Sequence, residues 1–365
     1  MRIQLSAPDL FRFAFLALAL VLTGTAFVLF FRGLPIDGTS LGIDRIFWAF
    51  EGGDIFYHGH DGLRNPPWSV LILIPTGFID DRTAWGLLVF FTLTVQIASV
   101  PHTPHRWRYW LAALLVVASF PSLRNMADAN LEGLIVAGGV LVVAGYRLRQ
   151  PWLLAPGVLL VTAKPQASIL LMLVLGVYVL QTWPRRLWLR TGALVLAVVI
   201  PTLIWRGQEW LAAVRGTYQA GSIIDVSLSA ALDRIGGVPA WLIIAVQVIF
   251  VLATLAVAWR ANRTLSREKA GMLVAAGLLL APYAAGNSVV SVLAIGIIPL
   301  FVAAPLTGGL LLMMVNLPFL FVGVDHIMYN YQSYWWTLCL LTAWGVFNWR
   351  IIRHEIAVPS REVHP

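Results

Sequence analysis

Long runs of apolar residues, interrupted by short polar or basic turns, recur along the whole chain and limit what it can fold into. Of its 365 residues, 59% are hydrophobic and only 12% are charged, whereas soluble domains carry roughly a quarter charged residues. The mean hydropathy is +0.81. The runs are continuous rather than alternating, which favours membrane helices over a transmembrane β-barrel. Because a helix needs about 20 apolar residues to cross a bilayer, the sequence predicts an all-α, polytopic membrane helical bundle of about 12 spans.

Lysine and arginine gather in alternate turns of this pattern. The basic turns contain Arg106 and Arg108; Arg147 and Arg149; Arg185, Arg186 and Arg190; Arg260, Arg263, Arg267 and Lys269; and Arg350 and Arg353. Cytoplasmic loops of membrane proteins carry an excess of such residues, so these turns and both termini are predicted to be cytoplasmic. The net charge of +8 is then explained by contact with anionic membrane lipids, and no nucleic-acid partner is expected.

The same alternation predicts how the chain is divided. Residues 1–365 form a single integral-membrane domain, with a first extracytoplasmic loop over 32–82 and a second outer loop over 206–237. Within the first loop, the apolar segment 68–79 is too short to cross a bilayer, so an interfacial position is predicted for it. The segment 84–100 is then predicted to span the membrane. The protein is expected to be a multi-pass protein of a bacterial plasma membrane.

The first outer loop is rich in carboxylates. It holds five of the 17 acidic residues, namely Asp37, Asp44, Glu51, Asp54 and Asp61. Asp44 begins a stretch whose apolar residues have helical spacing, which predicts a short amphipathic helix on the membrane surface. There the Asp44 carboxylate serves either as a general base toward an acceptor hydroxyl or as an N-terminal carboxylate that the helix dipole favours.

A second polar group interrupts an apolar run at Lys164, Pro165 and Gln166. A lysine at the centre of a membrane helix costs on the order of 3 kcal/mol unless it reaches water or an anion. Lys164 is therefore either a phosphate ligand facing a cavity or a snorkelling residue at a helix end. Asn130 and Glu132 open another apolar helix, where Asn130 is either the N-cap or forms with Glu132 a polar pair pointing into the same cavity as Lys164.

Three further groups admit two interpretations each. The corner from Arg64 to Trp68 is either a functional polar site or a turn with a tryptophan anchor. His58 and His60 are metal ligands or solvated loop residues, and no metal or other cofactor is predicted, although a divalent cation is not excluded. His326, near Tyr329 and Asn330, lines a sugar or phosphate site or belongs to an interfacial aromatic belt.

The order of these motifs resembles that of a known family. The motifs are Asp44 before an aromatic-rich helix, Gly52-Gly53-Asp54-Ile55-Phe56-Tyr57, Asn65-Pro66-Pro67-Trp68, Asn130-Leu131-Glu132-Gly133 and Lys164-Pro165-Gln166. Together they resemble the GT-C type of integral-membrane glycosyltransferase, and within it the bacterial α-1,2-mannosyltransferases that use polyprenyl-phosphate-linked mannose. The resemblance covers roughly the first 180 residues, and the remainder of the chain is similar in hydropathy alone.

The resemblance implies a GT-C fold and a set of residue roles. Asp44 would be the general base, and Lys164, Arg64 and Gln166 would lie near the donor phosphate. The expected substrate-binding residues are Tyr57, His58, Asn65, Asn130, Glu132 and His326. The chain departs from the family at Ala129, Asn130 and Glu132, where the family often has Gly-Gln followed by Asp or Asn, and this departure affects the sugar or acceptor contacts.

The expected function is therefore transfer of a hexose, most simply mannose, from a polyprenyl-phosphate-linked donor to a lipid or glycan acceptor at the extracytoplasmic face. The alternative is a transporter or flippase of a lipid-linked or small polar substrate. Transporters commonly place polar groups in broken helices near the bilayer midplane, often in paired halves. Here the acidic residues gather in a loop and no internal repeat is visible, which favours the transferase.

Overall fold

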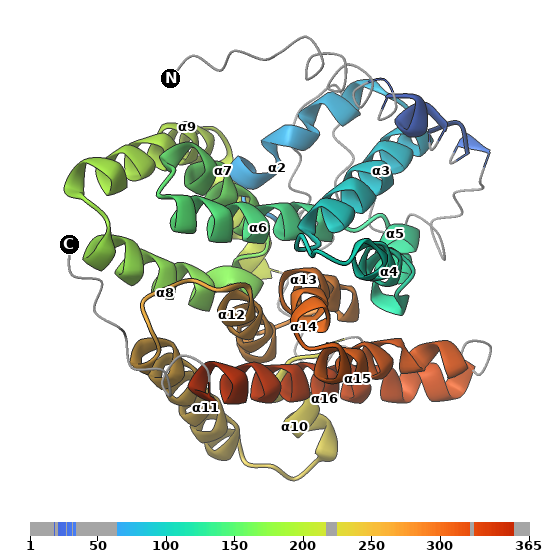
Figure 1. Cartoon of the computed structure of the whole chain (residues 1–365), viewed down its shortest axis with the longest axis vertical. Helices are drawn as coiled ribbons and strands as arrows, with labels where there is room; N and C mark the ends of the chain where they lie inside the picture. Colours follow the sequence, from blue (N-terminus) through green and yellow to red (C-terminus); the bar gives the residue numbers. More distant parts are fainter. Residues whose placement is uncertain are drawn as a thin grey trace.

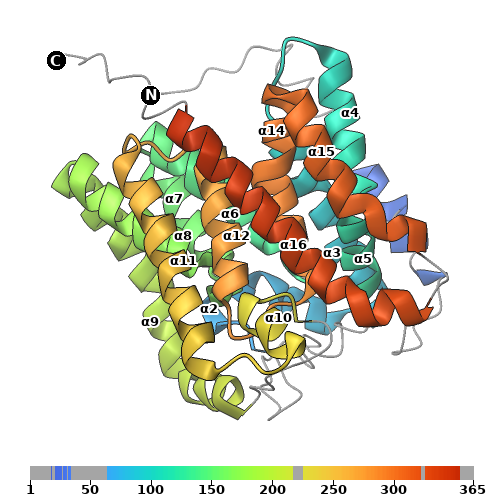
Figure 2. The ribbon, with the colours of Figure 1, turned by 90° about the horizontal axis from the view of Figure 1, so that it is seen from below.

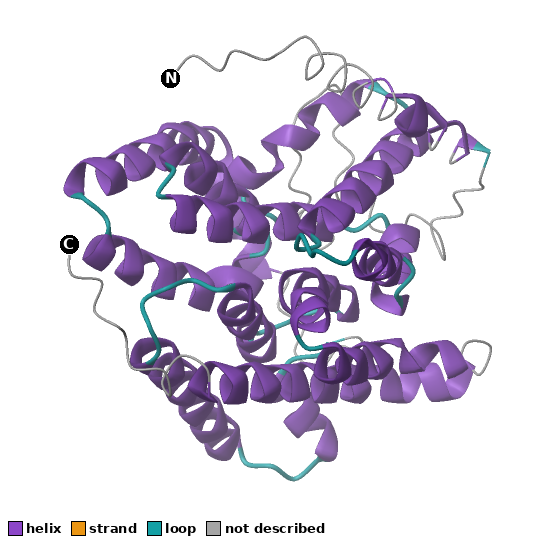
Figure 3. Cartoon of the chain, in the orientation of Figure 1, coloured by secondary structure: helices purple, strands orange, loops and turns teal. Residues whose placement is uncertain are grey.

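The part of the chain that can be described is almost entirely helical. The computed structural model describes residues 18, 21–26, 28–30, 32–33, 64–216, 225–321 and 325–353, without the side chains of 216, 321 and 325–332. Over these residues no β-strand is formed, and one antiparallel bridge joins Asp225 to Ala285 (Figure 3). The all-α fold class is therefore confirmed for this part. The amphipathic helix predicted after Asp44 lies outside it.

The first half of the described chain contains the helices that carry the predicted motifs. They are α2 (Pro67–Val70), the 3₁₀ helix η4 (Leu71–Phe78), α3 (Asp81–Ser99), α4 (Arg106–Val117), α5 (Phe120–Asp128), α6 (Glu132–Leu148), α7 (Pro151–Val161), α8 (Pro165–Thr182) and α9 (Arg185–Gly216). The apolar segment 68–79 thus forms two short helices, and the segment predicted to span at 84–100 lies within α3.

The second half supplies the centre of the molecule and one of its sides. Its elements are α10 (Leu228–Ile235), α11 (Ala240–Arg260), α12 (Arg267–Leu280), η5 (Gly286–Ser288), α13 (Val289–Val292), the π-helix η6 (Leu293–Ile297), α14 (Ile298–Ala303), α15 (Pro305–Asn316), η7 (Leu317–Phe321) and α16 (Asp325–Ile351). In Figure 1, α12, α13 and α14 lie between α6 and α8 on one side and α15 and α16 on the other. Most residues of α12 are buried, so it is a core helix.

Membrane-spanning segments can be assessed for the described residues alone. By length and hydropathy, four helical segments of the described chain can cross a membrane: Pro165–Thr182, Arg185–Arg215, Ala240–Arg260 and Gly286–Ala303. A fifth is obtained if α4 and α5, bent by 47° at their junction, count as one span. The expected total of about 12 is not confirmed. Breaks in the apolar runs leave several short helices. For example, α7 has 11 residues and α15 has 12, well under the roughly 20 that a span needs.

The polar and basic turns separate to two ends of the bundle, as the sequence pattern predicts. At one end, Asn65 donates to the carbonyl of Ala163, and Lys164 contacts Asn130. We call it the Lys164 end. At the other, which we call the arginine end, Arg147, Arg263 and Arg350 line neighbouring cavities. Figure 2 shows the longer helices from the side, with α2 and α10 toward one end of the molecule and α4 and α14 toward the other.

The predicted second outer loop, 206–237, contains more helix than expected. α9 runs 32 residues, to Gly216, and is therefore longer than a single crossing requires. α10 lies within the same predicted loop. Just before α10, the buried Asp225 accepts hydrogen bonds from the backbone N–H groups of Ser227 (2.9 Å) and Ala284 (3.0 Å). This part of the loop is thereby attached to the turn that follows α12.

Glycines set the separation of α6 and α7, which pack antiparallel. A Cβ added to Gly138 would lie 2.2 Å from the backbone nitrogen of Val161, and one on Gly145 would lie 2.5 Å from that of Leu154. A Cβ added to Gly157 would likewise lie 2.7 Å from the backbone nitrogen of Val142. Small residues of this kind allow membrane helices to approach closely. Since α6 begins at Glu132 and α7 leads directly to Lys164, the contact also fixes the separation of these two residues.

The cap of α3 predicts a stability that depends on pH. Thr83 donates to the Asp80 carboxylate from its backbone nitrogen (3.0 Å) and its hydroxyl (2.6 Å), and these bonds lower the pKa of Asp80 below its usual 3.8. The stabilisation is complete above the unfolded-state pKa and is lost as pH falls through the lower folded-state value. We expect Asp80→Ala to lower the free energy of unfolding by about 1 kcal/mol at neutral pH, measured by denaturant unfolding in detergent. Asp80→Asn should keep the cap and remove its dependence on acid. Equal acid sensitivity in the Asp80→Asn variant and the wild-type protein would contradict this account.

Candidate functional site

Lys164 is the centre of a hydrogen-bond network at the Lys164 end. It lies in the turn between α7 and α8, where Pro165 begins the next helix. Its ammonium group donates to a carboxylate oxygen of Glu132, to Asn130 Oδ1 (3.1 Å) and to Ser288 Oγ (3.1 Å). Three separate parts of the chain, the start of α6, the start of α8 and η5, therefore meet at one cation.

Glu132 is the anion that balances this cation. Its side chain has no solvent exposure, and that of Lys164 is only 14% exposed. The second carboxylate oxygen accepts a hydrogen bond from the hydroxyl of Ser291, one helical turn beyond Ser288. A buried carboxylate is tolerated when it is paired and its remaining oxygen is hydrogen-bonded. Both conditions are met at Glu132.

The end of the first outer loop is attached beside Lys164. The Asn65 side chain donates to the carbonyl of Ala163 at 2.6 Å, and the Trp68 indole donates to Thr162 Oγ1 at 2.9 Å. Trp68 also packs edge-on against Trp210 of α9, with ring centroids 5.3 Å apart. Trp210 in turn donates to the backbone carbonyl of Arg64 at 3.0 Å. The Arg64–Trp68 corner is therefore held next to the Lys164 turn by side chains that the sequence singled out.

A group of buried oxygen atoms near this network lacks hydrogen-bond partners. The Oδ1 atoms of Asn125, Asp128 and Asn287 are buried, and none accepts a hydrogen bond from the described residues. The other carboxylate oxygen of Asp128 accepts from Arg124 Nε at 3.0 Å. The Asn287 side chain forms a hydrogen bond with the Asp128 carboxylate, and Lys164 lies near enough to interact with it electrostatically. Buried acceptors without partners are rare in folded proteins and indicate a place where a ligand or water donates; sugar hydroxyls are donors of this kind.

The alternatives left open by the sequence are partly decided by this geometry. Asn130 is not the cap of α6, because the N-cap position is Leu131 and no side chain caps the helix. Asn130 faces Lys164 instead, since a mostly buried ammonium group needs hydrogen-bond acceptors. Lys164 does not snorkel to water, because it is mostly buried and ion-paired. Asn130 and Glu132 both contact Lys164; that the three residues face a common cavity stays a prediction.

Other predicted residues fall elsewhere or outside the described part. Gln166 is half-buried in the first turn of α8 and makes no hydrogen bond with a described residue, and Arg64 is exposed. Asp44, Tyr57 and His58, with the neighbouring His60, lie outside the described residues, as does the side chain of His326 in α16. Within the described ranges, no three His, Cys, Asp or Glu side chains are grouped closely enough to hold a metal ion.

The sequence reasoning missed four residues of this site. Ser288 and Ser291 are three residues apart in an apolar run, a spacing that places two hydroxyls on one helix face. Asn125 and Asp128 have the same spacing in α5. Such polar pairs at helical spacing could have been used to predict further polar side chains at the Lys164 end.

No protein-family model, curated protein or solved structure matches this chain. The functional assignment therefore depends on the residues of the Lys164 end and on their geometry.

Proposed function

We propose that the protein is a membrane glycosyltransferase that moves a hexose from a polyprenyl-phosphate-linked donor to a lipid or glycan acceptor at the extracytoplasmic face of the membrane. The observation that carries the proposal is the meeting of three separate motifs, Asn65–Trp68, Asn130–Glu132 and Lys164–Gln166, at one end of an apolar bundle. These are motifs on which the resemblance to GT-C enzymes rests. Polar groups within an apolar bundle are costly and usually functional.

The unpartnered oxygens support a hydroxyl-rich substrate. A hexose presents several hydroxyl donors around its ring, and Asn125, Asp128 and Asn287 present buried acceptor oxygens beside Lys164. Carboxylate and amide oxygens accept hydrogen bonds from such donors. We therefore assign recognition of the sugar to this group, with Asn130 and Glu132 holding Lys164 next to it.

The proposed chemistry is a single displacement with inversion. The acceptor oxygen forms a bond to the anomeric carbon as the bond from that carbon to the phosphate oxygen breaks. Asp44 takes the proton of the acceptor hydroxyl, and polyprenyl phosphate leaves with the electron pair. The ammonium group of Lys164 is paired with Glu132 and also donates to Asn130 and Ser288. It can therefore bind the donor phosphate only after its hydrogen bond to Asn130 or Ser288 is broken. Arg64, exposed on the adjacent corner, supplies a second cation for the leaving phosphate.

The test is transfer of labelled mannose from polyprenyl-phosphate mannose in membranes containing matched Asp→Asn variants. Asp44→Asn should lower the rate by about 10²–10⁴, the range for loss of a general base. Asp128→Asn should lower it tenfold or more, because one carboxylate oxygen becomes an NH2 group; with the amide oxygen kept by Arg124, the buried position no longer offers an acceptor to the substrate hydroxyl. Asp80→Asn, which changes an exposed carboxylate of helix α3, should transfer sugar at the wild-type rate.

Full transfer by Asp44→Asn would overturn the assignment of the base, and full transfer by Asp128→Asn would overturn the sugar site. Wild-type membranes that incorporate no sugar from any polyprenyl-phosphate hexose would overturn the proposed activity itself. Each variant should be compared at equal amounts of folded protein, determined by size-exclusion chromatography in detergent.

One set of observations favours the second candidate, a transporter or flippase. α4 and α5 form a helix pair broken by 47°, and the buried segment of α13 and α14 is interrupted by the π-helix η6. Broken helices that carry polar groups are typical of transport sites. A transporter would move a lipid-linked sugar across proteoliposomes without forming a new glycosidic bond, so the labelled product of the transfer assay distinguishes the two functions.

A further inference from the structure

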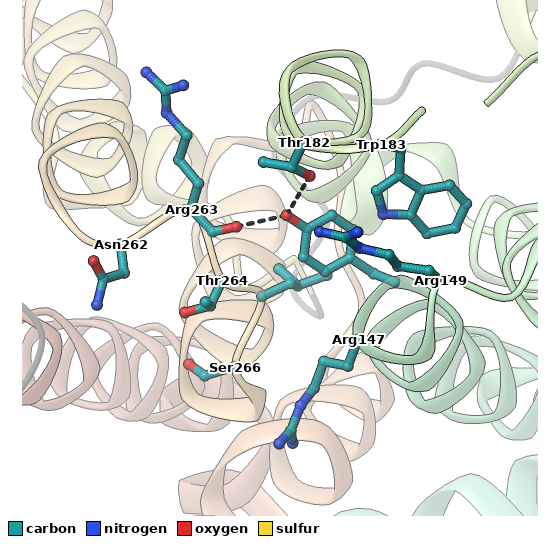
Figure 4. A pocket seen from close by; sticks show the side chains of 10 residues that line it. Arg147, Arg149, Thr182, Trp183, Asn262, Arg263, Thr264 and Ser266 are labelled. Carbon is teal, nitrogen blue, oxygen red and sulfur yellow. Dashed lines mark hydrogen bonds between the residues drawn. The ribbon is translucent and has the colours of Figure 1, made fainter. Parts of the chain in front are cut away.

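A cavity of about 730 Å³ lies at the arginine end, far from Lys164. α6 joins the two places, since it begins at Glu132 and its last turn holds Arg147, a separation of roughly 22 Å at 1.5 Å per residue. The ends of α6 and α8 and the loop between α11 and α12 line the cavity (Figure 4). Its size falls within the roughly 300–1,000 Å³ of small-ligand sites.

Among the residues that the structure describes, the cavity is lined by cations and by no acidic side chain. Its charged lining residues are Arg147, Arg149 and Arg263, accompanied by the polar side chains of Tyr146, Thr182, Asn262, Thr264 and Ser266. In Figure 4 the Arg149 side chain crosses the middle of the view beside Trp183, and Arg147 and Arg263 extend to opposite sides. The lining therefore attracts an anion with several acceptor oxygens.

The three guanidinium groups make no hydrogen bond or ion pair with any residue that the structure describes. The adjoining cavity shares Arg147 and Ser266 with this one, but its two other arginines do have hydrogen-bond partners. There Arg267 donates to three backbone carbonyls, one of them that of Ser99 at 2.8 Å, and Arg350 pairs with Glu268 at 3.1 Å. The second group of arginines has structural partners within the protein, and the first group has its charges available to a ligand.

The walls of the cavity are held by hydrogen bonds. The Tyr146 hydroxyl donates to the carbonyl of Arg263 at 2.5 Å and lies 3.1 Å from Thr182 Oγ1. The fully buried Lys269 donates to the carbonyls of Asn262 (2.5 Å) and Thr264 (2.9 Å). These bonds fix the loop between α11 and α12 against α6 and α8. The cavity is thus a formed feature of the fold.

The backbone at Arg149 also indicates a role other than stability. Arg149 follows the last turn of α6 with a φ of 51°, in the left-handed region. Glycine is the usual residue at this position because a side chain there is strained. Strained residues concentrate at binding sites, and here the strained residue is one of the three unpaired arginines.

The cavity lies next to the ends of two helices that are long and apolar enough to cross a membrane. Two of the segments able to cross a membrane, α8 and α11, end at Thr182 and Arg260. Thr182 lines the cavity, and the residues following Arg260 form its loop. Leu148, between two of the arginines, is 63% exposed. The charged lining is therefore next to apolar surface that acyl chains can cover.

We propose that this cavity binds the phosphate head group of an anionic phospholipid, with its acyl chains along the exposed apolar surface beside α6 and α8. The ligand chemistry is a phosphate-bearing anion, and the source is the membrane rather than a soluble metabolite. Anionic lipids are concentrated in the cytoplasmic leaflet, the side predicted for these basic turns. This site is independent of the glycosyltransferase proposal.

The test is thermal unfolding of the full chain, purified in detergent, with short-chain phosphatidylglycerol, short-chain phosphatidylcholine or glycerol 3-phosphate added. Phosphatidylglycerol should raise the Tm in a saturable way, and the other two should not. The triple variant Arg147→Gln, Arg149→Gln, Arg263→Gln should bind phosphatidylglycerol about a hundredfold more weakly, from about 1 kcal/mol per basic contact. The triple variant Arg185→Gln, Arg186→Gln, Arg190→Gln removes the same charge at the same end, from residues outside the cavity lining, and should respond as the wild type does.

A second variant separates binding from folding. Arg149→Gly removes one guanidinium and the backbone strain together, so its Tm without lipid should equal or exceed that of the wild type while its response to phosphatidylglycerol is reduced. Equal responses of the two triple variants would overturn the site, because the effect would then follow net charge alone. An equal Tm increase with glycerol 3-phosphate would overturn the lipid assignment.

Discussion

Gly138→Leu is expected to prevent α6 and α7 from packing and to leave little folded protein. The first added atom would already lie 2.2 Å from the backbone nitrogen and 2.6 Å from the Cα of Val161. A flexible side chain can move aside, but these are backbone atoms of a buried helix. The loss should exceed the roughly 1–3 kcal/mol typical of an overpacked core. The amount of monodisperse protein recovered in mild detergent, and its Tm, measure the effect.

Gly176→Leu is the matched control for this substitution. A Cβ at Gly176, on α8, would have no heavy atom within 4 Å, and glycine is disfavoured relative to leucine in a helix by up to about 1 kcal/mol. This variant should be as stable as the wild type or slightly more stable. If Gly138→Leu gave the same yield and Tm as Gly176→Leu, the close packing of α6 on α7 would be wrong.

Lys164→Met is expected to destabilise the protein by about 3–5 kcal/mol, because it leaves the carboxylate of Glu132 buried without its cation. Ser291 would remain as a hydrogen-bond donor to that carboxylate, but one hydroxyl does not neutralise the charge. The double variant Lys164→Met, Glu132→Leu should recover most of the loss, because a buried ion pair contributes little more than apolar residues of similar volume. Denaturant unfolding of the four proteins of this double-mutant cycle measures the coupling.

The exposed ion pair of α9 provides the comparison. Arg206 and Glu209 approach to 2.7 Å, with 47% of the Glu209 side chain exposed, so Glu209→Gln should cost no more than about 1 kcal/mol. If Lys164→Met lowered the free energy of unfolding as little as Glu209→Gln does, the charge of Glu132 would have to be compensated in the variant by some other group. A double variant as unstable as Lys164→Met alone would mean that packing, and not charge, is what Lys164 contributes.

The sequence was sufficient to identify the class of fold and much of the polar cluster. Continuous apolar runs predicted helices, and alternate basic turns predicted two chemically different ends. Lys164, Glu132 and Asn65 stood out because polar residues within apolar surroundings need partners. Asn65 and Ala163 are 98 residues apart along the chain, so the sequence gave no indication of contact, yet Asn65 is attached to the turn that holds Lys164.

The remaining features depend on tertiary contacts. Asn130 occupies a position where a cap is expected, but Lys164 from another helix competes for its oxygen. The predicted number of spans is not confirmed, because some apolar runs are broken near proline: α7, which ends just before Lys164 and Pro165, has only 11 residues, too few to cross a bilayer. The spacing of Ser288 and Ser291 places both hydroxyls on one helix face, but their partners, Lys164 and Glu132, are known only from the tertiary contacts.

The central position of α12 has a consequence for biosynthesis. Neighbours of this 14-residue helix include α8 from the first half of the chain and α16 from its end. α12 is too short to cross a bilayer on its own, and its ammonium group at Lys269 finds its acceptors in the preceding loop. α16 must therefore be synthesised before α12 can be enclosed. Insertion chaperones that shield incomplete bundles are expected to bind this protein while α16 is still being made.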